Sequence, residues 1–67
     1  MSDTPKQRVL KKWPKAVSDT DGWIESYGFF DCAIFPHADS DKVIGHGDTL
    51  RQAWADAARR LKRGRSA

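Results

Sequence analysis

Residues 50–61 repeat apolar side chains at the spacing of one face of an α-helix, and this stripe constrains the fold more than any other feature. It contains Leu50, Ala53, Trp54, Ala57, Ala58 and Leu61. Thr49 and Gln52 fit a capping box at its start, and Gly64 is expected to end the helix. Asp56 is expected to pair with Arg60 one turn later. A helix with a single apolar stripe needs a sheet or a second helix to cover it.

A shorter helix is predicted near the N-terminus, where Thr4 is a suitable N-cap and Pro5 a suitable first residue. Its apolar side contains Val9, Leu10 and Trp13. Pro14 should stop it, because the residue before a proline is disfavoured in the helical region. The other positions are largely basic, which favours a solvated helix face over a dedicated binding surface.

A seven-residue run of strand-forming residues, Phe29–Phe35, predicts the central strand of a sheet. Alternation places one set of side chains on a core face: Phe30, Cys32 and Ile34. The opposite face then carries Phe29, Asp31, Ala33 and Phe35. We expect this second face to meet solvent or a partner.

Further strands and turns are expected on both sides of that run. Residues 23–27 should form the preceding strand after a turn at 21–22, and residues 16–19 are candidates for an additional strand. Residues 42–44 are expected to form a short last strand. It should run into a tight turn at 45–47, just before the C-terminal helix.

Together these elements predict the fold class α+β. We expect a two-layer sandwich in the order helix, β-meander of three or four antiparallel strands, helix, with both helices on one sheet face. The 67 residues suffice for one domain, 1–67, with frayed ends at 1–3 and 65–67. A single cysteine favours a reducing compartment, and no apolar run approaches the roughly 18 residues of a membrane span. The expected location is therefore the cytoplasm.

The charges are segregated along the chain. Residues 1–16 carry five basic residues and one acidic, residues 17–50 one basic and seven acidic, and residues 51–67 six basic and one acidic. The net charge of +3 is therefore an average over +4, −6 and +5. This pattern predicts a domain with two faces of opposite charge.

Two candidate binding surfaces follow from this pattern. An acidic and aromatic sheet face would bind a protein partner through Trp23, Glu25, Tyr27, Phe29, Asp31 and Phe35. The basic helices would bind nucleic acid or an acidic partner through Lys11, Lys12, Lys15, Arg51, Arg59, Arg60 and Arg63.

The residues that could support catalysis or metal binding do not form a known pattern. The stretch from Gly45 to Thr49 has no lysine, so it does not match a phosphate-binding loop. Cys32, His37, His46, Asp39 and Asp41 match no metal-ligand spacing. A chain of this size is also expected to lack a water-excluding cleft of about 300 Å³. We therefore expect no enzyme activity, no metal or cofactor, and no small-molecule substrate.

Several strings carry a resemblance to known families. Val9-Leu10, Trp13-Pro14-Lys15-Ala16, the stretch 44–49 and the stretch 53–61 resemble small phage- and prophage-encoded accessory proteins. Some of those are anti-CRISPR or other anti-defence inhibitors that act by binding. Phe35-Pro36 and Gly47-Asp48-Thr49-Leu50 with Ala53 are similar to the HicB antitoxin domain. The expected topology is also similar to the double-stranded RNA-binding domain, which would imply that Arg51 contacts phosphate.

These resemblances imply a non-enzymatic protein that binds a host protein or ribonucleoprotein complex in the host cytoplasm, most simply as an inhibitor of a defence system. The alternative is direct binding of double-stranded RNA or DNA by the basic helices. We expect no membrane partner.

Overall fold

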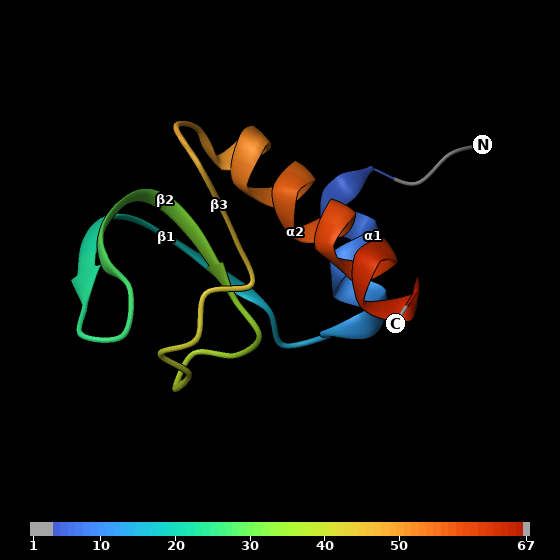
Figure 1. The fold of residues 1–67 in the computed structure, drawn as a ribbon, viewed down its shortest axis with the longest axis horizontal. Coiled ribbons are helices and arrows are strands. Elements are labelled where there is room, and N and C mark those ends of the chain that lie inside the picture. Colours follow the sequence, from blue (N-terminus) through green and yellow to red (C-terminus); the bar gives the residue numbers. More distant parts are fainter. Residues whose placement is uncertain (1–3, 67) are drawn as a thin grey trace.

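The computed structural model describes the backbone of residues 4–66 and the side chains of residues 4–61 (Figure 1). In chain order the elements are α1 (Pro5–Lys12), β1 (Val17–Ile24), β2 (Gly28–Phe35), β3 (Gly45–Gly47) and α2 (Leu50–Ser66). The strands form one antiparallel sheet in the order β1-β2-β3. The α+β class is confirmed, with three strands. Of the ends expected to fray, residues 1–3 and 67 lie outside the described residues.

Helix α1 begins and ends as predicted. The Thr4 side chain accepts a hydrogen bond from the Gln7 backbone N–H at 3.2 Å, and the Gln7 side chain accepts one from the Thr4 N–H at 3.1 Å. This reciprocal pair satisfies two backbone donors that a helix start otherwise leaves open. The helix ends at Lys12, one residue before Trp13 and two before Pro14.

Helix α2 differs from its prediction at both ends. Thr49 accepts a hydrogen bond from the Gln52 N–H at 3.1 Å, but the Gln52 side chain accepts from the Asp48 N–H at 3.0 Å, not from Thr49. The expected end at Gly64 is wrong, because the helix continues to Ser66. Glycine adopts right-handed helical angles at a cost of only about 1 kcal/mol, so it does not by itself end a helix.

Helix α2 packs on β2 and β3, and α1 packs against α2 on the same side of the sheet (Figure 1). Strand β3 approaches α2 closely because it has glycines there. A Cβ at Gly45 would lie 2.5 Å from the Ala57 Cβ, and one at Gly47 would lie 2.6 Å from the Gln52 Cβ. The sequence predicted a last strand at 42–44 and a tight turn at 45–47. This prediction is wrong, because the last strand is formed by residues 45–47.

The apolar residues form two clusters. The helix-side core contains Val9, Cys32, Ile34, Ala53, Trp54, Ala57 and Ala58. A second cluster of Phe30, Ala33 and Phe35 is covered by Val17, Ile24 and Val43. Phe30 was expected beside Cys32 and Ile34, but its ring lies 5.8 Å from that of Phe35. These two residues are an odd number of positions apart, so the regular alternation of faces is broken within β2.

The break lies at a pair of aspartates. Thr20 pairs with Cys32 and Gly22 pairs with Phe30, but Asp21 and Asp31, which lie between these pairs, are not paired in the β-ladder. Asp21 has a φ of 50°. The turn expected at 21–22 is wrong, because β1 runs through both residues. A Cβ at Gly22 would lie 2.4 Å from the Phe30 ring, so this glycine makes room for the aromatic ring.

Candidate functional site

The turn between β1 and β2 carries exposed aromatic side chains. Phe29 is 85% exposed, Trp23 57% and Tyr27 42%. The strand register pairs Trp23 with Phe29, and their rings meet edge to face with centroids 6.4 Å apart. Aromatic residues are large apolar groups that a small domain usually buries, so their exposure together marks a candidate contact surface.

The same hairpin carries acidic residues, two of which, Asp21 and Asp31, line a hollow together with Phe29. Glu25 and Asp31 are exposed, as is Asp21, which lies opposite Asp31 on the neighbouring strand. We refer to Trp23, Glu25, Tyr27, Phe29 and Asp31 as the hairpin surface. The structure thus brings five of the six residues of the predicted sheet-face site to one exposed hairpin.

Phe35 is the exception, and its placement corrects the prediction. It is only 5% exposed and packs in the second apolar cluster with Phe30. Val17, Ile24 and Val43 cover that cluster, so Phe35 cannot contact a partner. The prediction failed because it took the outer sheet face to be open along its whole length.

Two hollows flank Phe29 and Asp31. One, of about 450 Å³, is lined by Asp21, Gly22, Phe29, Phe30 and Asp31. The other, of about 400 Å³, shares Phe29, Phe30 and Asp31 and also reaches Tyr27 and His46. The Tyr27 and His46 rings lie 5.5 Å apart. No local pattern in the sequence connects these two residues, which meet only through the pairing of β3 with β2.

Asp56 in α2 links the helix to β3. Its carboxylate accepts hydrogen bonds from Arg59 Nη2 at 2.9 Å and from the His46 backbone N–H at 3.1 Å. Arg60 Nε lies 3.1 Å from Oδ2, which confirms the predicted pair. Burial alone would raise the pKa of Asp56, but Arg59, the His46 N–H and Arg60 together lower it below its ordinary value.

The predicted basic site does not form one patch. Arg59 and Arg60 both engage Asp56, which offsets part of their charge. Arg51 lies nine residues before Arg60 on α2, about 14 Å along the helix axis. The Arg63 side chain lies outside the described residues.

The remaining three cations of that site lie together at the end of α1 and just after it. They are Lys11, Lys12 and Lys15. Lys12 Nζ lies 5.8 Å from the centre of the Trp13 ring. Lys12 and Arg60 line one cleft, so the structure does connect these two predicted residues.

Cys32 is buried, and its thiol donates a hydrogen bond to the Asp48 carbonyl oxygen at 3.6 Å. Burial raises the pKa of the Cys32 thiol, and the nearby charges of Asp31, Asp21 and Asp48 raise it further. A raised pKa keeps the sulfur in its less reactive protonated form at neutral pH.

The surface has open clefts, one of which has a volume of about 600 Å³. His37 lines this cleft, whereas Cys32 and His46 line the 400 Å³ hollow. The structure therefore does not bring Cys32 to His37, or His37 to His46. Within the described side chains, no group of three or more His, Cys, Asp or Glu residues is arranged to hold a metal ion.

Comparison of the chain with protein-family models, with curated proteins and with solved structures gave no match. Over the described residues, neither helix has the length and apolar character needed to cross a membrane.

Proposed function

We propose that this protein acts by binding another protein through the hairpin surface. The observation that carries the proposal is the exposure of Phe29, at 85%, in edge-to-face contact with the exposed Trp23. Large aromatic residues at the centre of an interface commonly supply most of its binding energy. Since both rings are largely exposed among the described residues, a partner protein would supply the missing contacts.

The chemistry of the partner follows from the acidic residues. Glu25, Asp21 and Asp31 lie on the same hairpin as the rings, and all three are exposed. An acidic rim attracts a basic protein surface and repels an acidic one, which speeds encounter and limits wrong pairings. The proposed partner therefore presents an apolar pocket with lysine or arginine at its rim.

A pull-down from host-cell lysate tests this proposal. The bait is the full chain, compared with the variants Phe29→Ser and Leu50→Ala. Leu50 is 40% exposed and starts α2, so it is a matched control for the loss of an exposed apolar side chain. We expect a protein recovered with wild type and Leu50→Ala to fall about 10-fold or more with Phe29→Ser. Equal recovery by all three baits would reject the hairpin surface.

We further propose that the partner belongs to a host defence complex and that binding inhibits it. This proposal rests on the resemblance to phage accessory proteins. Expression of the protein in a bacterium with an active CRISPR system should raise the plating efficiency of a targeted phage, whereas Phe29→Ser should not. An unchanged plating efficiency with wild type would exclude inhibition of that system and leave the binding proposal to the pull-down.

A further inference from the structure

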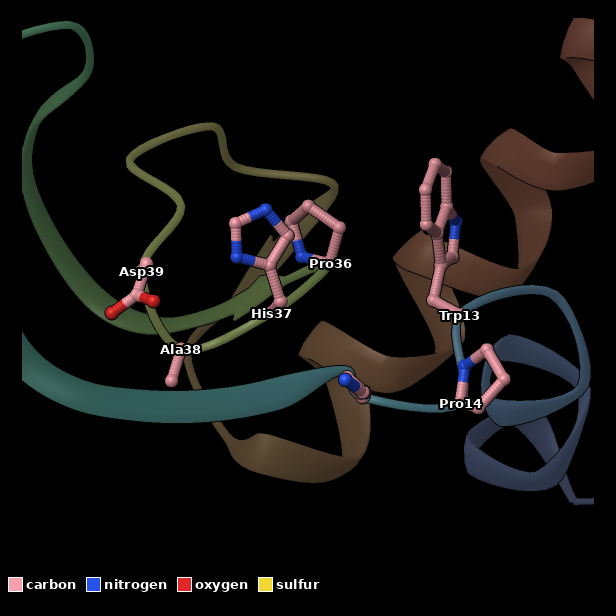
Figure 2. Close-up of a pocket in the computed structure, with 7 residues that line it drawn as sticks. Trp13, Pro14, Pro36, His37, Ala38 and Asp39 are labelled. Atoms are coloured by element: carbon pink, nitrogen blue, oxygen red, sulfur yellow. The ribbon is translucent and has the colours of Figure 1, made fainter.

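A separate cleft lies between the loop after α1 and the loop after β2, and none of its lining residues belongs to the hairpin surface. Its volume is about 600 Å³, and it is lined by Trp13, Pro14, Lys15, Pro36, His37, Ala38 and Asp39. Figure 2 shows Trp13 on one side of the cleft, with Pro36 and His37 on the other. Both walls contain ring side chains, and the proline in each loop restricts the backbone that presents them.

The Trp13 side chain also lines a second cleft, of about 310 Å³. This cleft contains Lys12 and Arg60, whereas the first contains Lys15. The indole is held at this position because the Trp13 backbone N–H donates to the Val9 carbonyl at 2.7 Å and its ring packs against the helix-side core. A fixed aromatic ring therefore stands between two hollows, each with a positively charged side chain.

The charge around this ring is predominantly positive. Residues 4–18 contain five basic residues and no acidic one. Among the described residues, Asp39 is the only carboxylate that lines either cleft, and it belongs to the loop opposite α1. An anionic chain could therefore follow the α1 side, where Lys12 and Lys15 lie.

We propose that these two clefts bind single-stranded nucleic acid. One base stacks between Trp13 and the Pro36–His37 wall, and Lys12 and Lys15 contact the adjoining phosphates. Single-strand binding proteins combine aromatic stacking surfaces with cationic grooves in this way. A duplex keeps its bases stacked inside, so it cannot insert one into the cleft without unpairing it. A proline-rich peptide could also use the flat walls, but it would not need the flanking cations.

Fluorescence anisotropy tests the proposal with the full chain and a fluorescein-labelled ten-nucleotide oligothymidylate. We expect Trp13→Ala to weaken binding about 10-fold, a typical loss for one stacked base. Lys15→Glu should weaken binding and reduce the salt dependence by about 0.7 in the log–log slope, the contribution of one phosphate contact. Trp23→Ala removes an exposed tryptophan from the hairpin surface and should leave binding unchanged.

Trp13 packs against the core, so Trp13→Ala could unfold the chain. His37→Ala serves as the second variant, because His37 is exposed and forms the opposite wall. It should weaken binding several-fold with an unchanged Tm. The proposal is overturned if His37→Ala and Lys15→Glu both bind as wild type does. It is also overturned if the oligonucleotide fails to bind at 50 mM salt, if a duplex binds more tightly, or if a proline-rich decapeptide does.

Discussion

Replacement of Gly45 by alanine tests the closest contact in the fold, that between β3 and α2. The added Cβ would lie 2.5 Å from the Ala57 Cβ, 2.6 Å from the Ala57 backbone nitrogen and 2.7 Å from the Ala53 carbonyl oxygen. No side-chain rotation relieves these contacts, because two of the three atoms are backbone and the third is a Cβ. The strand and the helix must therefore move apart.

Such overpacking costs up to about 3 kcal/mol. A chain of 67 residues has a free energy of unfolding of roughly 3–10 kcal/mol, so this is a large fraction of its stability. At about 4–8 °C per kcal/mol, a cost of about 3 kcal/mol should lower the Tm of Gly45→Ala by about 12–24 °C, measured by circular dichroism at 222 nm.

Gly28→Ala is the matched control for this measurement. A Cβ at Gly28 would have no neighbour within 4 Å, but the residue has a φ of 101° that side-chain-bearing residues rarely adopt. Gly28→Ala should therefore lower the free energy of unfolding only by this conformational cost, about 1 kcal/mol. If Gly45→Ala melts at the same temperature as Gly28→Ala or above it, β3 does not lie against α2 as described.

Three further predictions concern single side chains. Because the pKa of Asp56 is lowered in the folded state, its carboxylate stabilises the fold above the ordinary value near 4, and this stability is lost as pH falls through the lower folded value. Asp56→Asn should thus lower the free energy of unfolding by about 1–2 kcal/mol at pH 7. It should also abolish most of the decline in Tm that the wild type shows as the pH falls from about 5 to about 3. Cys32 should react with a thiol reagent at least about 10-fold faster in urea-unfolded than in folded protein, and equal rates would contradict its burial. Phe29→Ser should change the free energy of unfolding by less than about 0.5 kcal/mol in a urea titration, since the side chain is already 85% exposed.

The helices could be predicted because their signals are local. The spacing of the apolar stripe and the residues at the helix starts lie within a few positions of one another, and those positions remain neighbours in the folded chain. Thr4 is the N-cap of α1 and Pro5 its first residue, as predicted. The Asp56–Arg60 pair was predictable for the same reason, since residues four apart share a helix face.

The predicted turns at 21–22 and 45–47 were wrong because glycine is typical both of turns and of strands that another element approaches closely. Asp21-Gly22 and the glycines of 45–47 were interpreted as turns, but both segments are strands. Gly22 is required by the Phe30 ring, and Gly45 by α2. Each requirement comes from a residue on another element, so a local reading of the sequence cannot distinguish it from a turn.

The candidate site was predicted only in part, because the burial of one of its residues depends on contacts that are distant in sequence. Exposure of Trp23 and Phe29 follows from their position beside the hairpin turn, beyond the residues of β2 that pair with β3. The burial of Phe35 depends on Val43, which follows β2 by a long loop, and on the break in alternation opposite Asp21. Strand alternation predicts a face only where the ladder is regular.

The two proposed surfaces are built from different residues of a molecule whose longest extent is 35 Å. The hairpin turn lies at one end and α1 at the other (Figure 1), whereas the loop after β2 meets the hairpin turn, where the Ser26 hydroxyl donates to the Asp41 carbonyl at 2.9 Å. Phe29 and Lys15 line different clefts with no lining residue in common, so substitutions at these two positions should have additive effects. Phe29→Ser should therefore leave oligonucleotide binding unchanged, and Lys15→Glu should leave the recovery of a protein partner unchanged. If either substitution affected both activities, one surface would have to serve for both, and the separation of acidic and basic segments along the chain would not correspond to separate functions.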